Sequence, residues 1–395
     1  MTPATQRAVA PTAPQTAAPA APEPSPPQPL DDLVAAREDV QSRLAQFSAE
    51  ARWSTGDGPW SPRPASVPTL WRYRDLRPLA LESARFARAD DAALRVVSLV
   101  NPGTADRATA HVTSPNGSPS AVGHLYSGLQ LQNPGESMTA HRHAASALRF
   151  VIEGSGAWTV VNGDRLEVGP NDFVITPGGT WHEHGTDAGD APVIWQDGTD
   201  DPLVNALDAN FFALHPDRHQ SPGRIVNASL LEYGSGLLAP DTRRSGAASP
   251  LLLFPWDKTY TALRDLAQVS TGSPYDGVIM EYVNPATGGP VMPTIGAHMQ
   301  LLRPGQPTLA HRHTGSVVYQ VAEGRGHSVI AGQRFDWEKN DIFCVPSWAW
   351  HEHANDDESE DACLFSFHDF PALRSLGLYA EEALESGDGH QELHV

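Results

Sequence analysis

A pattern of three histidines occurs twice in this chain. The first copy runs from His141 to His184 and reads HRHAASALRFVIEGSGAWTVVNGDRLEVGPNDFVITPGGTWHEH. The second copy runs from His311 to His353 and reads HRHTGSVVYQVAEGRGHSVIAGQRFDWEKNDIFCVPSWAWHEH, so it begins about 170 residues after the first. Similarity at a fixed offset indicates an internal duplication. We therefore expect two copies of one fold.

Each copy begins with a His-x-His pair, which suits a β-strand. Because residues i and i+2 of a strand face the same side, His141 and His143 present two imidazoles to one side of a sheet. A third histidine, His182, follows a series of short alternating segments separated by glycine-rich turns. Consecutive antiparallel strands that close into a barrel bring the first and last strands together. The pattern predicts an all-β chain with three histidines gathered in each barrel.

Three neutral imidazoles at one place indicate a metal site. Such a set suits iron, zinc, copper, nickel or manganese, and it leaves coordination positions open for exogenous ligands. A single buried histidine is usually a hydrogen-bonded core residue, but two His-x-His pairs that are each followed by WHEH are improbable as packing accidents. The candidate ligands are His141, His143 and His182 in the first copy and His311, His313 and His351 in the second.

The motifs around these histidines resemble those of a known family. The stretches Gly135–His143 (G-x5-H-x-H) and Pro177–His182 (P-x-G-x-x-H) resemble the two cupin motifs, and their repetition resembles a bicupin. This resemblance implies two double-stranded β-helix (jelly-roll) barrels with a few accessory helices. More narrowly, the chain resembles gentisate 1,2-dioxygenase and its relatives that cleave salicylate or 1-hydroxy-2-naphthoate. The stretches that carry this likeness are LWRYRDLRPL (70–79), VNPG (100–103), YSGLQ (126–130), ALRFVIEG (147–154), DGVIMEYVNPATGGPVMPT (276–294) and VPSWAWHEHAN (345–355).

A departure from the broad cupin pattern narrows the chemistry. Many metal cupins carry a glutamate four or five residues after the second histidine, but Ala147 and Leu148 fill these positions here. Neither side chain can bind a metal, so the three histidines leave roughly three coordination positions free. A bidentate hydroxy acid and dioxygen can occupy these positions together, as cleavage of an aromatic ring requires.

Arg149 is the candidate for binding an anionic substrate. It follows His143 by six residues, an even interval, so it faces the same side of a regular strand. A guanidinium can bind a carboxylate bidentately; the alternative is a surface arginine paired with a local carboxylate. The second copy has Tyr319 at the corresponding position, and Trp348 replaces Gly179, which is expected to crowd its opening. We expect the first barrel to carry the chemistry and the second set of histidines to be vestigial or to serve an interface.

The resemblance implies further functional residues in and around the first copy. His184 stands two residues from His182 and shares its inward face, where an imidazole could move protons; merely orienting another group is the alternative. Tyr126 could equally be part of an ordinary barrel core. The resemblance assigns substrate binding to Arg95, Tyr126, Gln130 and Arg149, and catalysis to Arg149, His184 and Asp197.

The same resemblance implies an Fe(II)-dependent dioxygenase that acts on gentisate (2,5-dihydroxybenzoate). Such an enzyme opens the bond between the carboxyl-bearing and hydroxyl-bearing carbons to give maleylpyruvate, with both atoms of dioxygen incorporated. A related enzyme that acts on salicylate or 1-hydroxy-2-naphthoate would share every metal ligand and is the first alternative. A non-catalytic metal-binding bicupin is the second. The partners implied are the aromatic hydroxy acid, dioxygen and other copies of the chain in a homotetramer.

Composition excludes several other classes of function. A formal net charge of -20 and an isoelectric point near 5.2 argue against nucleic acid or an anionic membrane as a partner. No apolar stretch approaches the roughly 18 residues of a membrane-spanning helix. Cys344 and Cys363 lie in apolar, strand-like contexts and predict a reduced, buried pair. Together with a ferrous site, they favour a cytoplasmic location.

The chain of 395 residues is long enough for two domains of about 150 residues each. Residues 1–30 are rich in proline and alanine and predict a disordered tail. We expect an N-terminal helix and arm at 31–95, the first cupin barrel at 96–202, an inter-barrel linker with a helix at 203–275, the second cupin barrel at 276–372, and a C-terminal helix and tail at 373–395.

Overall fold

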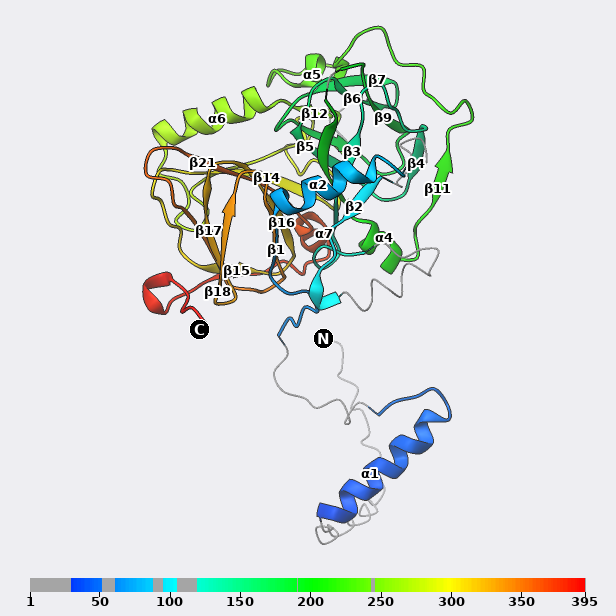
Figure 1. The fold of residues 1–395 in the computed structure, drawn as a ribbon. Coiled ribbons are helices and arrows are strands. Elements are labelled where there is room, and N and C mark those ends of the chain that lie inside the picture. The colour runs from blue at the N-terminus through cyan, green and yellow to red at the C-terminus, as the bar shows by residue number, and fades with distance from the viewer. Residues whose placement is uncertain are drawn as a thin grey trace, which may run out of the picture. The chain divides into compact units, whose positions relative to one another are not determined.

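Two barrels of short antiparallel strands make up most of the chain (Figure 1). The computed structural model describes residues 30–51, 61–87, 95–104, 119–189, 191–242 and 246–394. Both barrels lie in one unit, residues 62–395, which confirms the expected pair of all-β barrels. The predicted N-terminal helix is α1 (Leu30–Ala45), in a separate unit formed by residues 1–61. Residues 1–29 of the predicted tail lie outside the described residues.

The first barrel consists of two antiparallel sheets. The six-stranded sheet has the order β12 (Leu253–Phe254), β8 (Phe173–Thr176), β5 (Ala147–Glu153), β10 (Val193–Thr199), β3 (Tyr126–Gln132) and β2 (Val96–Ser98). The five-stranded sheet has the order β11 (Phe212–Leu214), β4 (His141–His143), β9 (His182–Thr186), β6 (Ala157–Val161) and β7 (Asp164–Val168). The candidate metal ligands therefore belong to neighbouring strands of the smaller sheet.

The second barrel repeats this arrangement. Its six-stranded sheet has the order β1 (Thr69–Trp71), β19 (Ile342–Val345), β16 (Val317–Glu323), β21 (Ala362–His368), β14 (Gly296–Leu302) and β13 (Val278–Glu281). Its five-stranded sheet has the order β18 (Gln333–Glu338), β17 (Arg325–Ile330), β20 (His351–Asn355), β15 (His311–His313) and β22 (Glu381–Ala383). Strand β1 comes from the N-terminal arm, so this segment is part of the second barrel.

Short helices connect and flank the barrels. They are α2 (Tyr73–Ser83), α4 (Asp201–Ala206), α5 (Ala228–Tyr233), α6 (Trp256–Val269), α7 (Phe370–Ser375) and the 3-10 helices η2 (Pro102–Thr104) and η3 (Gly387–Gly389). The linker helix expected from the sequence is α6. Residues 373–395, where a C-terminal helix was expected, contain the end of α7, then β22 and η3. Among the described residues, every helix is too short or too polar to cross a membrane.

The strands that face the neighbouring barrel are buried on both sides. In β5, Leu148 and Phe150 belong to a core that both barrels share, and the Phe150 ring stacks on Phe365 with 4.2 Å between the ring centroids. The alternate residues Arg149 and Val151 face the interior of the first barrel. Burial of both faces explains why the sequence ALRFVIE is a nearly continuous apolar run rather than an alternating one.

The structural repeat extends beyond the barrels themselves. We call residues 201–220 the first strap and residues 370–391 the second strap. In the first strap, β11 pairs with β4, and Phe212 lies opposite His143. In the second strap, β22 pairs with β15, and Glu381 lies opposite His313. Each strap thus adds an edge strand beside the strand that carries the His-x-His pair.

A buried glutamate holds the end of each strap. Glu183 stands between two inward-facing histidines and therefore faces outward, where its carboxylate accepts a hydrogen bond of 2.8 Å from the backbone N–H of Gln220. The Nδ1 atom of His219 lies 2.7 Å from the other carboxylate oxygen. In the second strap, Glu352 makes the matching contacts with Gln391 (3.0 Å) and His390 (2.6 Å). The His-Gln pairs of the two straps are therefore equivalent anchors.

Replacing Glu352 with alanine is expected to release the second strap. The change leaves the backbone N–H of Gln391 without its acceptor and should lower the free energy of unfolding by about 1–3 kcal/mol. Denaturant unfolding measures the stability, and hydrogen exchange followed by mass spectrometry measures the opening of residues 381–391. Glu352→Gln keeps an acceptor oxygen and serves as the control with a smaller loss. Unchanged exchange in Glu352→Ala would show that the strap does not depend on this carboxylate.

Candidate metal centre and active site

The three histidines of the first copy converge at one place. His141 and His143 lie on β4, and His182 lies on β9 directly opposite His141. The ring centroids are 5.7 Å apart for His141 and His143, 4.3 Å for His141 and His182, and 4.8 Å for His143 and His182. One ring nitrogen from each histidine lies within 4.8 Å of the other two. The barrel thus brings together the residues predicted as metal ligands.

Backbone carbonyls orient all three rings. Each Nδ1 atom lies within hydrogen-bonding distance of the carbonyl oxygen of a residue two positions away. The distances are 2.9 Å from His141 to Thr139, 2.8 Å from His143 to Ala145 and 3.0 Å from His182 to Thr180. An Nδ1–H group bound in this way leaves the Nε2 lone pair free for a metal.

The donor set fits a divalent transition metal. The Nε2 atom of His182 is buried and has no hydrogen-bond partner among the described residues. An unpaired buried polar atom is costly, and a bond to a metal would satisfy it. Burial lowers the pKa of His141 to about 4 and holds the pKa of His182 well below its usual range; the charge of Arg149 lowers both further. The imidazoles are therefore neutral at physiological pH, the form that binds metals.

Arg149 enters the same barrel from the opposite sheet. Its Nε atom lies 3.1 Å from Oδ1 of Asp197, the residue opposite it on β10, and its Nη1 atom donates a hydrogen bond of 3.1 Å to Thr176. Only 7% of Arg149 and 8% of Asp197 is exposed, so Arg149 is not a surface arginine, although it does pair with a carboxylate. Burial raises the pKa of Asp197 to about 6, against the opposing effect of Arg149. A permanent cation thus sits inside the barrel with an acid that titrates near neutrality.

His184 stands beside the metal-ligand histidines. Its Nδ1 atom lies 3.1 Å from the hydroxyl of Thr159, the residue opposite it on β6, and its ring centroid is 5.4 Å from that of His182. The Nε2 atom is buried and has no hydrogen-bond partner in the described part of the chain. Burial holds the pKa of His184 well below its usual range. A neutral imidazole with an unused polar atom therefore lies next to the three ligands.

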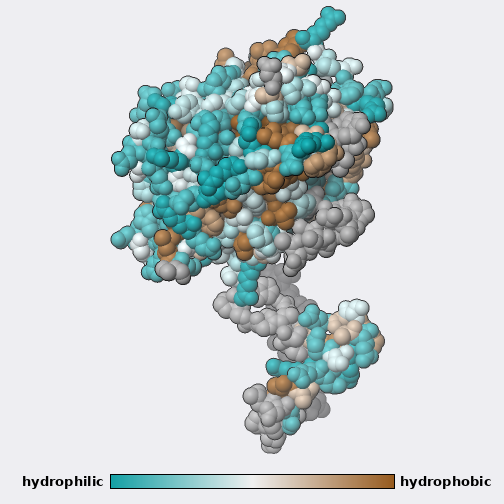
Figure 2. Space-filling model, in the orientation of Figure 1, coloured by the Kyte–Doolittle hydropathy of each residue, from teal (hydrophilic) through white to brown (hydrophobic). Residues whose placement is uncertain are grey.

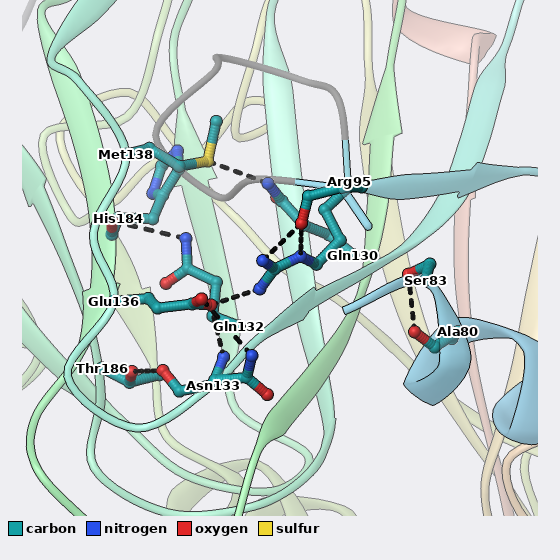
Figure 3. A network of polar contacts seen from close by, with 11 residues as sticks. Ala80, Ser83, Arg95, Gln130, Gln132, Asn133, Glu136, Met138, His184 and Thr186 are labelled. Atoms are coloured by element: carbon teal, nitrogen blue, oxygen red, sulfur yellow. Dashed lines mark hydrogen bonds and ion pairs between the residues drawn. The ribbon is translucent and has the colours of Figure 1, made fainter. Parts of the chain in front are cut away.

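The other residues predicted for substrate binding are held by protein contacts (Figure 3). Gln130 on β3 donates a hydrogen bond of 2.8 Å to the sulfur of Met138. It also accepts a hydrogen bond of 3.0 Å from the indole N–H of Trp195. The guanidinium of Arg95 pairs with Glu136 and also donates to a backbone carbonyl. Arg95 is thus neutralised by a carboxylate in this structure.

Some residues of the site could not be chosen from the sequence. Thr176 orients Arg149, and Thr159 contacts His184. Ser98 was not predicted either; its hydroxyl lies 3.1 Å from the hydroxyl of Tyr126, which the resemblance had indicated. The only signal for the two threonines is their inward position on strands, and their partners depend on a strand register that local patterns do not contain.

The second copy also forms its cluster of histidines, but one expectation about it was wrong. Trp348 was expected to crowd the opening beside His311, His313 and His351. Instead its ring packs against Arg312, with the guanidinium carbon 4.5 Å from the ring centroid. The cavity beside these histidines is lined by other residues. A positive backbone φ angle of 65° at Trp348 accompanies this orientation.

Known proteins share both the sequence and the fold of this chain. The family of cupin domains matches residues 128–198 and 298–368. Gentisate 1,2 dioxygenase 1 of Aquipseudomonas alcaligenes is 35% identical over 87% of this chain and 96% of its own length. The 5-aminosalicylate 1,2-dioxygenase of a Comamonas species is 38% identical over 84% of this chain and 85% of its own length. The chain belongs to the gentisate 1,2-dioxygenase family.

A solved structure agrees with this assignment. The salicylate 1,2-dioxygenase of Pseudoaminobacter salicylatoxidans, in its adduct with gentisate, has a TM-score of 0.79 and 31% sequence identity; the match covers 90% of this chain and 95% of that chain. The resemblance seen in the sequence is confirmed, and the chain is a bicupin and a ring-cleaving dioxygenase of this family. Because relatives are named for different hydroxylated or aminated aromatic acids, family membership leaves the substrate open.

Replacing His143 with alanine is expected to remove the metal of the first barrel and the ring-cleaving activity. Two imidazoles remain, and the affinity of this site for a divalent metal should fall by at least about 100-fold. Elemental analysis of the purified protein should show one ion fewer per chain, and an oxygen electrode should show no turnover. Arg142→Ala is the matched control, because Arg142 lies between two ligands but faces outward onto Trp181. Full metal content in His143→Ala would contradict the assignment.

Proposed function

We propose that this protein is an Fe(II)-dependent dioxygenase whose substrate is gentisate. The reaction opens the ring between the carboxyl-bearing and hydroxyl-bearing carbons and adds both atoms of dioxygen to give maleylpyruvate. One observation carries the proposal: a buried arginine, Arg149, faces the same barrel interior as three neutral histidines. A hydroxylated aromatic carboxylate presents a metal-binding oxygen pair and a negative charge, and this interior offers a partner for each.

His141, His143 and His182 would hold the iron, which when bound supplies a template for the two substrate oxygens and an electron route between ring and dioxygen. Arg149 would bind the substrate carboxylate. A charge-assisted hydrogen bond is strong in a site that excludes water, and the cation is already fixed by Thr176 and Asp197. The barrel interior thus orients the acid before the ring reacts.

Gentisate differs from salicylate by a second hydroxyl group, para to the first. We propose that His184 and Asp197 bind this group. The Nε2 atom of His184 lacks a partner in the described residues, and Asp197, with a pKa of about 6, can accept or hold a proton near neutral pH. A site that hydrogen-bonds a substrate hydroxyl discriminates strongly against the analogue without it, because its buried polar groups are then left unpaired. This feature favours gentisate over salicylate and 1-hydroxy-2-naphthoate.

Three further residues are proposed to shape the substrate pocket. Burial raises the pKa of Tyr126, and the nearby charge of Asp197 raises it further. Tyr126 therefore remains a neutral phenol close to the ion pair of Arg149 and Asp197. Gln130 is fixed by Trp195, whose ring centroid lies 6.3 Å from that of His184. Arg95 is proposed as a second cation for the substrate, a role that requires its guanidinium to move away from Glu136.

We also propose a homotetramer in the cytoplasm. Figure 2 shows hydrophobic patches on one face of a mainly hydrophilic surface. The first strap exposes the apolar side chains of Phe211, Phe212 and Leu214 beside the ligand strand β4, as a subunit interface would require. Cys344 and Cys363 are both buried and unpaired, and a reducing compartment would also keep iron ferrous. Light scattering on the protein as it elutes from a size-exclusion column would measure the number of chains in each oligomer.

Parallel assays with three substrates test the choice of gentisate. Protein reconstituted with Fe(II) under anaerobic conditions is exposed to air with gentisate, salicylate or 1-hydroxy-2-naphthoate. Oxygen uptake and product mass are recorded. We expect a product heavier by two oxygen atoms from gentisate, with a kcat/KM at least about 100-fold above that for salicylate. Comparable values for the two acids would contradict the proposed role of His184 and Asp197.

Replacing Arg149 with alanine is expected to preserve the metal and weaken substrate use. Truncating one partner of a buried charge pair typically costs about 2–5 kcal/mol, which corresponds to a loss of roughly 30-fold to several thousand-fold in kcat/KM. Steady-state kinetics and metal content measure the two effects separately. Arg149→Lys keeps the charge but loses the planar fork, so it should recover part of the loss. Normal kcat/KM in Arg149→Ala would remove Arg149 from the carboxylate-binding role.

A further inference from the structure

The second barrel preserves the geometry of the three histidines. His311 and His313 lie on β15, and His351 lies on β20 opposite His311. The ring centroids are 5.8 Å apart for His311 and His313, 4.2 Å for His311 and His351, and 4.9 Å for His313 and His351. Each value lies within about 0.1 Å of its counterpart in the first barrel. A cluster without a binding role would not need to keep this arrangement.

One buried nitrogen atom of this cluster has no hydrogen-bond partner among the described residues. The Nδ1 atom of His351 lies 3.0 Å from the carbonyl oxygen of Ala349, and its Nε2 atom is buried without a partner among the described residues. Buried unpaired nitrogens are costly in a protein interior. Bonds to a metal ion would remove part of this cost.

A cavity of about 630 Å³ lies beside the cluster. Its lining contains the carboxylates of Asp276, Glu281 and Glu381, and Oδ1 of Asp276 lies 3.9 Å from Nε2 of His311. Arg374 also lines the cavity, but its guanidinium stacks on the ring of Tyr379 at 4.5 Å. The excess of carboxylates favours a cation in this cavity and disfavours an aromatic carboxylate.

The strand register shows what differs between the two barrels. In the first barrel, three residues opposite one another on neighbouring strands are Arg149, Asp197 and Gly128. At the corresponding positions in the second barrel are Tyr319, Ser366 and His298. The second barrel has therefore lost the buried cation proposed to bind the substrate, while it has kept all three histidines that can bind a metal.

We propose that the second barrel is a second metal centre, in which His311, His313 and His351 bind one divalent transition-metal ion. Asp276 supplies negative charge close to the ion. Borderline metals such as cobalt, zinc, iron and manganese accept this combination of imidazole and carboxylate groups. The centre does not bind the aromatic acid, because the position of Arg149 is taken by a tyrosine. This role replaces the vestigial one expected from the sequence and does not rest on gentisate as the substrate.

Metal stoichiometry tests the proposal on the full-length protein. Protein stripped of metal is loaded with Co(II), desalted and assayed by elemental analysis. We expect two ions per chain in the wild type, one in His143→Ala, one in His313→Ala and none in the double variant. His327→Ala is the control, because His327, Asp336 and Asp356 form a third, more exposed cluster on the surface. The His327→Ala variant should retain two ions per chain. A single ion per chain in the wild type would overturn the proposal, and this outcome does not depend on the folding of any variant.

Assays of ring-cleaving activity distinguish a failure of this proposal from a failure of the proposed function. His313→Ala, loaded with Fe(II), should lose one ion and keep its kcat/KM for ring cleavage, whereas His143→Ala should keep one ion and lose turnover. Loss of turnover in His313→Ala with the first ion retained would overturn the claim that the second centre has no part in substrate chemistry. Failure of the wild type to cleave any aromatic acid would defeat the proposed function and leave the stoichiometry intact.

Discussion

The site depends on the pairing of one short strand with the strand that closes the barrel. His141 lies directly opposite His182, and His311 lies directly opposite His351. Because side chains alternate across a strand, a slip of one residue in either pairing would turn a ligand toward the outside. The register therefore fixes the metal site, and the glutamates that anchor the straps follow from it, because Glu183 and Glu352 must face outward when their neighbours face inward.

The core that the two barrels share explains how the protein tolerates the buried ion pair of Arg149 and Asp197 beside the metal site. Arg149 and Asp197 lie on strands whose other faces pack against the second barrel through residues such as Phe150. A buried ion pair repays its desolvation only when its geometry is fixed and its remaining polar atoms are satisfied. Thr176 and the rigid sheet fix the geometry. Nε of Arg149 and Oδ1 of Asp197 make no hydrogen bond within the described residues, so these two atoms are left for a ligand. The second barrel thus contributes to the first site through packing, although it supplies none of the proposed catalytic groups.

The sequence was a good guide to elements with a local signal. The His-x-His spacing, the duplication, the even interval from His143 to Arg149 and the linker helix could all be recognised from neighbouring residues. It was a poor guide where partners lie far apart in the chain. The contacts of Arg149 with Thr176, of Arg95 with Glu136 and of Trp348 with Arg312 depend on register and side-chain direction. Local periodicity contains neither, so the orientation of Trp348 was predicted wrongly.

The two straps show that the duplicated unit was larger than a barrel. Each copy includes an edge strand beside its ligand strand and a His-Gln pair bound to an outward-facing glutamate. In an ancestor with one such unit, the strap could already pair with the strand that carried the metal ligands. Fusion of two copies gave them a common apolar interior, and β1, which precedes the first barrel in the chain, pairs with β19 of the second barrel. Divergence could proceed in one half, because each strap pairs with the ligand strand of its own barrel.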